Sequence, residues 1–258
     1  MRLFRRTALA LCLGVAAAVG TDAAAQRPDT ITIRGHALPL HLYGDASKDP
    51  VIVTSGDGGW IHLAPHVAEF LAERGYYVIG FDARAYLASF TSGKSTLKPA
   101  DEPGDYRALI DYAKRTTPAR PVLIGVSEGA GLSLLAATDA ATKTAIDGVI
   151  GLGLPDLNEL GWRWKDAVIY LTHGMPNEPT FSAAEVAASV APAPLAAIHS
   201  TADEYVPLSE VQTVMDRARE PKRLWIVKAS NHAFSGNVQE FDTRLLEAIA
   251  WVRQNKAQ

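Results

Sequence analysis

Ser127 lies between two glycines in a segment that is first apolar and then rich in small residues, Pro121-Val-Leu-Ile-Gly-Val-Ser-Glu-Gly-Ala-Gly131. An apolar strand that runs into Gly-x-Ser-x-Gly and then into a helix is typical of a nucleophile elbow, a tight turn that lifts the serine hydroxyl clear of a sheet. The sequence therefore predicts that Ser127 is a nucleophile. The alternative is a tight strand-to-helix turn in which the hydroxyl of Ser127 only caps the helix.

A serine nucleophile needs a base, and a histidine base needs a carboxylate that fixes its tautomer. Both partners follow Ser127 in the order expected for this type of site, and each comes in a loop after a late apolar run: Asp203 first, then His232. We expect His232 to accept the serine proton and Asp203 to orient its imidazole. Glu204, directly after Asp203, is the alternative acid.

The negative charge that develops during acyl transfer needs backbone donors as well. A glycine-rich loop, Ser55-Gly-Asp-Gly-Gly-Trp60, follows the early apolar run at 51–53. In a nucleophile-elbow fold, this loop and the residue after the serine supply the oxyanion hole. The predicted donors are therefore the amide of Asp57 or Gly58 together with that of Glu128. The alternative is a glycine turn that has no catalytic part.

Two carboxylates near an oxyanion hole oppose the charge that must form there, so Asp57 and Glu128 call for an explanation. If their side chains face the substrate, they can receive a cationic group such as the ammonium of an aminoacyl ester. On that interpretation, Asp57, Glu128 and Trp60 are substrate-binding residues. The alternative is that both carboxylates point outward, with Asp57 capping the helix that follows and Glu128 binding an arginine such as Arg84.

The remaining histidines suggest weaker hypotheses. His62 and His66 are one helical turn apart, a spacing that suits a metal, but no third ligand is evident, so surface or packing roles are expected. His199 lies within an apolar run and is interpreted as a histidine of the core or the sheet edge. His173 is a candidate for contact with substrate. We predict no metal and no organic cofactor.

Short apolar runs alternate with helical patterns along most of the chain, as expected for strands that are buried on both faces. The runs occupy residues 51–53, 77–81, 122–124, 149–152, 195–198 and 224–227. Helices are predicted at about 62–74, 104–115, 129–138, 208–218 and 240–254. Residues 30–34 and 38–43 alternate in polarity and predict an antiparallel hairpin. Together these patterns predict a three-layer α/β fold with a mostly parallel sheet and an N-terminal antiparallel hairpin.

The first 25 residues have the features of a secretory signal peptide. Three arginines precede an apolar run from Ala8 to Val19, and the small residues Ala23-Ala-Ala25 precede Gln26. Such a run is too short for a good transmembrane helix, although an uncleaved anchor is the alternative. Cleavage would remove the only cysteine, so the mature chain could form no disulfide. We expect a protein of the bacterial periplasm or a secreted one.

The composition of the 258 residues is that of a globular protein, with 48% hydrophobic and 21% charged residues. The net charge of −3 implies no extensive basic surface for nucleic acid, so no nucleic-acid partner is expected. One α/β domain is expected over residues 26–258. Within it, residues 155–191 are irregular and form either a small cap or a long connection.

The combination of Ser127, Asp203 and His232 resembles the α/β-hydrolase family over essentially the whole mature chain. More narrowly, Ser55-Gly-Asp-Gly-Gly-Trp60 resembles the signature of the VirJ/AcvB group of exported, virulence-associated bacterial proteins. Gly80-Phe-Asp-Ala-Arg-Ala-Tyr86 lies where that group has a Gly-x-Asp-x-x-x-Tyr segment, while the C-terminal half is similar to dienelactone hydrolases and esterases. The resemblance implies an α/β-hydrolase fold, and the narrower group is associated with hydrolysis of aminoacylated phosphatidylglycerol.

The sequence thus predicts an exported serine hydrolase that cleaves a carboxylic ester through an acyl-enzyme. The expected substrates are small-molecule or lipid esters, with an aminoacyl lipid among them, and a lipid substrate would bring the protein into peripheral contact with a membrane. Two alternatives remain. One is a non-catalytic periplasmic binding or virulence-associated protein on a hydrolase scaffold, and the other is a serine peptidase.

Overall fold

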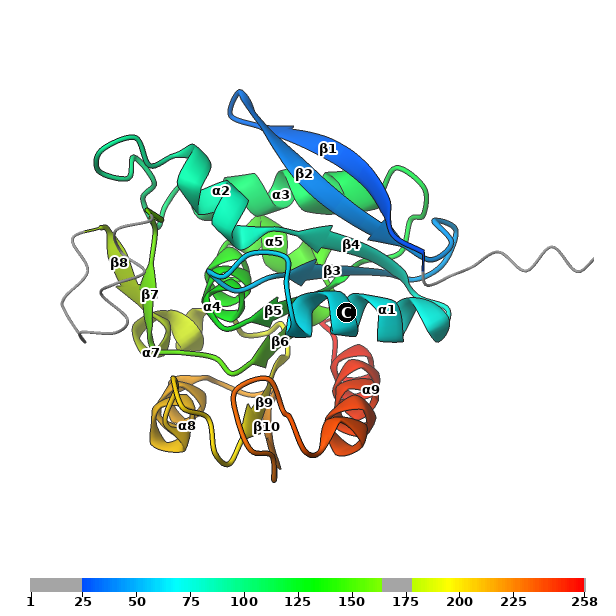
Figure 1. Cartoon of the computed structure of the whole chain (residues 1–258), viewed down its shortest axis with the longest axis vertical. Helices are drawn as coiled ribbons and strands as arrows, with labels where there is room; N and C mark the ends of the chain where they lie inside the picture. Colours follow the sequence, from blue (N-terminus) through cyan, green and yellow to red (C-terminus); the bar gives the residue numbers. More distant parts are fainter. Residues whose placement is uncertain (1–24, 164–177, 258) are drawn as a thin grey trace, which may run out of the picture.

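The computed structural model describes residues 25–163 and 178–257, which form a central eight-stranded sheet covered by helices (Figure 1). The strand order is β1-β2-β4-β3-β5-β6-β9-β10. All neighbours from β4 to β10 are parallel, whereas β1–β2 and β2–β4 are antiparallel. The predicted fold class is therefore confirmed. The strands are β1 (Arg27–Ile33), β2 (His36–Tyr43), β3 (Pro50–Thr54), β4 (Tyr77–Phe81), β5 (Val122–Val126), β6 (Gly148–Leu152), β9 (Leu195–Ser200) and β10 (Lys222–Val227).

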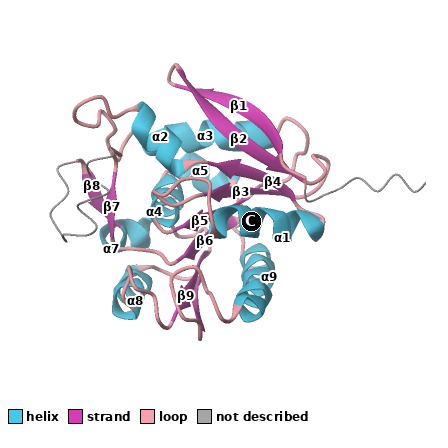
Figure 2. Ribbon diagram, in the orientation of Figure 1, coloured by secondary structure: helices cyan, strands magenta, loops and turns pink. Residues whose placement is uncertain are grey.

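Helices pack on both faces of the sheet, as the ribbon in Figure 2 shows. The helices α1 (Leu63–Glu73) and α9 (Val238–Gln254) share one hydrophobic cluster with the sheet. A second cluster on the opposite face includes α2 (Ala83–Ser89), α3 (Glu102–Ala113), α4 (Glu128–Ala136) and α8 (Leu208–Arg217). Successive residues of a strand point to opposite faces, so Leu123 joins the second cluster and Ile124 the first. This double burial explains the continuous apolar runs.

The sequence analysis did not predict two short helices and two short strands. Segments this short lack a long periodic pattern of apolar residues. The helix α2 begins at a capping aspartate, Asp82, whose side chain accepts a hydrogen bond from the amide of Ala85. The helix α5 (Ala140–Ala145) begins in the same way at Asp139. Side-chain capping of this kind satisfies amides that have no intrahelical partner, and it allows helices of six or seven residues to form.

The irregular region contains a small antiparallel sheet of β7 (Leu157–Glu159) and β8 (Thr180–Ser182), followed by α7 (Ala183–Val186) and a 3₁₀ turn (Ala187–Ser189). It packs tightly against α4, since a Cβ at Gly131 would come within 1.7 Å of the Asn158 Oδ1 atom. Residues 164–177, with the candidate His173, lie outside the described residues. Whether residues 155–191 act as a cap stays a prediction.

The predicted signal peptide lies almost entirely outside the described residues, which begin at residue 25. Within 25–163 and 178–257, no helix has both the length and the apolar character needed to cross a membrane.

Parallel strands bring the loops at their carboxyl ends to one edge of the sheet, where open α/β folds place their sites. The loops after β3, β5, β6, β9 and β10 meet there. These loops contain the predicted oxyanion loop, Ser127, Gly153, Asp203 and His232.

Candidate active site

Ser127 occupies a strained turn between β5 and α4. Its φ is 52° and its ψ is −120°, a conformation that L residues rarely adopt outside functional sites. Close packing requires the neighbouring glycines. A Cβ at Gly125 would lie 2.0 Å from the carbonyl oxygen of Gly129, and a Cβ at Gly129 would lie 2.3 Å from the carbonyl oxygen of Ser55. The hydroxyl of Ser127 makes no capping hydrogen bond. The elbow geometry is therefore confirmed, and the capping alternative is wrong.

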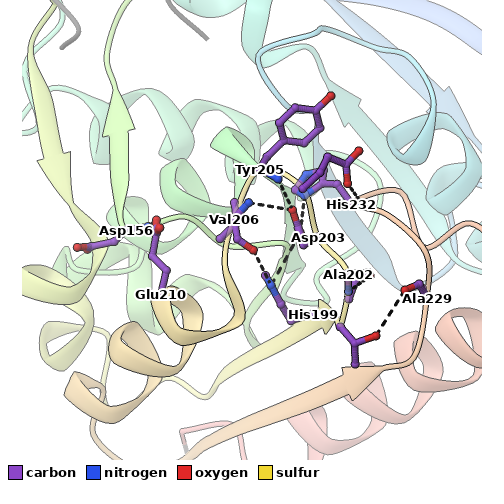
Figure 3. A network of polar contacts seen from close by, with 12 residues as sticks. Asp156, His199, Ala202, Asp203, Tyr205, Val206, Glu210, Ala229 and His232 are labelled. Atoms are coloured by element: carbon purple, nitrogen blue, oxygen red, sulfur yellow. Dashed lines mark hydrogen bonds and ion pairs between the residues drawn. The ribbon is translucent and has the colours of Figure 1, made fainter. Parts of the chain in front are cut away.

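Asp203 and His232 form the predicted pair, shown in Figure 3. The His232 Nδ1–H donates to Asp203 Oδ2 over 2.6 Å. The other carboxylate oxygen of Asp203 accepts from the amides of Tyr205 and Val206 at 3.0 and 2.9 Å. Burial alone raises the pKa of Asp203, but the hydrogen bond from His232 and those from the two amides outweigh it, so the pKa lies below its usual value. Asp203 is thus ionised and holds one tautomer of His232.

Glu204 has a different contact from its neighbour. Its Oε2 accepts a hydrogen bond of 2.7 Å from the backbone N–H of His232, while the ring of His232 binds Asp203. The carboxylate of Glu204 therefore holds the main chain of the histidine loop rather than the imidazole. Sequence reasoning considered Glu204 only as an alternative acid and missed this role, because nothing local distinguishes the two neighbouring carboxylates.

Ser127 and His232 each lie next to one of two consecutive residues at the end of β6. The amide of Ser127 donates to the carbonyl of Leu152 over 2.8 Å. The next residue, Gly153, has a φ of 61°, and a Cβ there would lie 2.4 Å from the Cε1 atom of His232. Among the described residues, the buried Nε2 of His232 has no hydrogen-bond partner, which leaves it able to accept a proton. Gly153 was missed by the sequence analysis, although a glycine directly after a strand is a signal for a close approach.

The glycine-rich loop after β3 lies against the elbow. Its turn is closed by a hydrogen bond of 3.0 Å from the amide of Gly59 to the carbonyl of Gly56. A Cβ at Gly56 would lie 3.4 Å from the Cβ of Ser127. Within residues 25–163 and 178–257, the amides of Asp57, Gly58 and Glu128 donate no hydrogen bond. The predicted oxyanion donors are thus uncommitted amides on the two sides of Ser127.

The side chain of Glu128 is buried, with only 6% of its surface exposed. Burial raises its pKa well above 4.5, and the nearby carboxylates of Asp57 and Glu159 raise it further, against a lowering by the amide of Glu159. Among the described residues, the Oε1 of Glu128 has no hydrogen-bond partner. The expectation that Glu128 points outward is therefore wrong. Asp57 does not cap α1 either, because that helix begins at His62 without a side-chain cap.

The other candidates have structural contacts. Trp60 packs on the sheet, as described below, and a contact between Trp60 and substrate stays a prediction. His66 Nε2 binds Asp242 Oδ1 at 2.8 Å, whereas His62 is exposed. His199 is fully buried and donates from Nε2 to the carbonyl of Val206 at 3.0 Å. Across the described residues, no three His, Cys, Asp or Glu side chains form a group that could hold a metal.

This sheet order, with a serine elbow after β5 and an aspartate and a histidine after the last two strands, defines an α/β-hydrolase fold. Residues 49–250 match the family described as bacterial virulence protein (VirJ), and the chain belongs to that family. It is similar to the uncharacterized protein YfhR of Escherichia coli O157:H7, with 28% identity over 214 residues that cover 80% of this chain and 72% of that protein.

Solved structures show the same fold. Est1E from Butyrivibrio proteoclasticus superimposes with a TM-score of 0.65 and 16% identity, over 87% of this chain and 98% of that chain. Dienelactone hydrolase from Anabaena variabilis superimposes with a TM-score of 0.63 and 15% identity, over 91% of this chain and 99% of that chain. At such low sequence identities, the similarity to these structures establishes the fold and does not establish the reaction.

Proposed function

We propose that this protein is an exported serine hydrolase that cleaves a carboxylic ester through Ser127, His232 and Asp203. The observation that carries the proposal is the state of His232: its Nδ1 is bound to a buried, ionised Asp203, and its Nε2 has no partner among the described residues. An imidazole whose Nδ1 is held by a carboxylate and whose Nε2 has no partner can take the proton of a serine hydroxyl.

The proposed reaction has two steps. Ser127 Oγ attacks the ester carbonyl carbon while His232 Nε2 takes the hydroxyl proton, and the amides of Glu128 and of Asp57 or Gly58 donate to the oxyanion. The intermediate collapses, the alcohol leaves with the proton from His232, and the acyl group remains on Ser127. Water then gives a proton to His232 and attacks the acyl-enzyme, which releases the carboxylic acid and restores the serine hydroxyl.

The carboxylates beside the nucleophile support a finer proposal, in which the substrate carries a cationic group, as an aminoacyl lipid ester does. Glu128 is buried near Asp57 and Glu159, and no cation is among the groups that perturb its pKa. An ammonium group would neutralise this arrangement and favour ionisation of Glu128. The buried, unpartnered Oε1 of Glu128 offers a matching acceptor.

Covalent labelling tests the nucleophile. A fluorophosphonate probe should label Ser127 in the wild type and fail with Ser127→Ala, while Ser209→Ala, an exposed serine on α8, should label normally. Ser127→Ala and His232→Ala should each lower kcat by about 10³-fold or more, and the double variant should lose little further, because the residues act as a unit. A folded wild type with neither labelling nor turnover would favour a non-catalytic binding protein. Faster cleavage of amides than of matched esters would favour a peptidase.

A substrate panel tests the cationic group. Glu128→Gln and Asp57→Asn should slow lysyl or alanyl esters about 5- to 150-fold more than a neutral acyl ester of similar size, and added salt should weaken the preference. Equal effects of both variants on charged and neutral esters would remove the cation proposal and leave the hydrolase proposal intact.

Export is the remaining part of the proposal, and it rests on the first 25 residues of the sequence and on membership of a bacterial virulence protein family. The mature protein should begin at or near Gln26 and occur in the periplasmic fraction or the medium. Recovery of chains that begin at Met1 in the membrane fraction would show instead that the segment is an anchor.

A further inference from the structure

The indole of Trp60 packs on the N-terminal part of the sheet, against His41 and Gly80. His41 of β2 and Gly80 of β4 are direct partners in the antiparallel register. A Cβ at Gly80 would come within 2.2 Å of the Cη2 atom of Trp60 and within 2.5 Å of its Cζ2 atom. The indole therefore occupies the space that the missing side chain of Gly80 leaves. Any larger residue at position 80 would displace Trp60.

Two further contacts hold the indole in this position. The ring of His41 stacks on it with 4.6 Å between centroids and an interplanar angle of 4°. The Nε1–H of Trp60 donates to the hydroxyl of Tyr43 over 3.2 Å. Among the described residues, neither ring nitrogen of His41 has a hydrogen-bond partner, and burial lowers the pKa of His41, so the ring acts as a neutral stacking surface.

Hydrogen bonds also fix the loop of residues 55–60 at its first residue, Ser55, and at the backbone of Trp60. The amide of Ser55 donates to the carbonyl of Phe81 at 3.0 Å, and the hydroxyl of Ser55 accepts from the amide of Ala83 at 3.0 Å. The amide of Trp60 donates to Asp82 Oδ2 at 3.4 Å. Between these ends, Gly56 lies directly against Ser127. A loop this rich in glycine has a high conformational entropy, so its geometry depends on such anchors.

We propose that Trp60 is a positioning residue whose indole, seated on Gly80 and stacked on His41, fixes the loop of residues 55–60 so that its free amides face the oxyanion. This inference rests on the proposed hydrolase function. It also gives the antiparallel β1–β2 hairpin a part in catalysis, because β2 supplies both His41 and Tyr43. Trp60 acts through the loop and needs no contact with substrate.

Kinetics of three variants test the positioning role. Trp60→Ala and Gly80→Ala should lower kcat about 10- to 100-fold with little change in KM, because misplaced oxyanion donors weaken transition-state binding. Affinity for a boronic acid, which mimics the tetrahedral intermediate, should fall in parallel. Trp60→Phe keeps an aromatic ring against His41 and should recover part of the loss. Two controls should behave like wild type: Gly104→Ala, where a Cβ meets nothing within 4 Å, and Trp251→Phe on α9.

Hydrogen exchange measured by mass spectrometry tests the loop independently of catalysis. The hydrogen-bonded amides of Ser55 and Gly59 should exchange faster in Trp60→Ala than in wild type, while a peptide from α3 should be unchanged. A variant that melts at a lower temperature but keeps wild-type kcat, boronic-acid affinity and loop exchange would overturn the inference. If the wild type itself is not labelled at Ser127 and turns over no ester, the proposed function fails, and loop exchange alone then decides whether Trp60 positions the loop.

Discussion

Asp203 and Glu128 are two largely buried carboxyl groups at the same edge of the sheet, and their surroundings drive them to opposite charge states. Asp203 accepts hydrogen bonds from the ring of His232 and from two backbone amides, and its pKa lies below the usual value. Glu128 is desolvated near two other carboxylates, and its pKa lies well above 4.5. Burial opposes ionisation at both positions, so the number of donors decides the outcome.

The contrast between Asp203 and Glu128 also distinguishes the two sides of the candidate site. One side is the pair of loops with Asp203 and His232, and the other is the loop of residues 55–60 with the start of α4. The histidine side is rich in hydrogen bonds, and its ionised Asp203 holds the ring of His232. The side with the loop of residues 55–60 has free amides, and its buried Glu128 is neutral, so Glu128 adds no charge to the nearby carboxylates of Asp57 and Glu159. Glu128 begins α4, where the helix dipole favours an anion, yet desolvation and the neighbouring carboxylates outweigh that attraction.

Replacing the ionised acid should give the largest effect. Asp203→Asn should keep the fold and lower kcat by about 10⁴-fold, because an amide in this position no longer selects the productive tautomer of His232. Glu204→Gln is the matched control, since it retains an oxygen that can accept from the amide of His232, and it should lower kcat less than about tenfold. Steady-state kinetics with an activated ester measure both. A silent Asp203→Asn with an inactive Glu204→Gln would reverse the assignment of the acid.

The close approach of the His232 ring to Gly153 predicts an effect of intermediate size on kcat. In Gly153→Ala, the new methyl group would overlap the ring of His232 and the residue would keep a positive φ, so the imidazole must shift. A displacement of about 1 Å in a catalytic group costs about 10²-fold in kcat. Gly93→Ala, where a Cβ meets nothing within 4 Å, is the control for a glycine replacement. Wild-type kcat in a folded Gly153→Ala protein would contradict the predicted contact.

The neutral acid, Glu128, also predicts a smaller effect, on the pH dependence of stability. Folded Glu128 keeps its proton above pH 4.5, whereas the unfolded carboxyl loses it, so the folded state binds more protons and the free energy of unfolding falls as pH rises. Glu128→Gln removes this dependence. Relative to wild type, the variant should gain up to about 1.4 kcal/mol per pH unit above pH 5.

Urea denaturation at pH 5, 6, 7 and 8 measures this difference. Glu69→Gln, an exposed glutamate on α1, is the control and should follow the wild-type pH dependence. Parallel stability curves for wild type and Glu128→Gln would mean that Glu128 is ionised in the folded protein, and the contrast with Asp203 would then be lost.

Much of the fold follows from local patterns. The strands β3, β4, β5, β6 and β9 were predictable because both faces of each are covered, which leaves uninterrupted apolar runs such as residues 122–126. The elbow was predictable for a similar reason, since the sharp turn and the close α4 packing exclude any side chain at Gly125 and Gly129. The helices α2 and α5 were missed because their six or seven residues have no periodic pattern beyond a capping aspartate.

The order of the apolar runs and the glycines around Ser127 determined the scaffold and the elbow at Ser127, because each depends on neighbours in the chain. The tertiary structure alone decided between adjacent Asp203 and Glu204, since their contacts are with the ring and the amide of a histidine 29 and 28 residues away. It also decided that Glu128 is neutral and that Trp60 is seated on Gly80. Charge state and packing arise from groups that only folding brings together, which is why they cannot be seen in the order of residues.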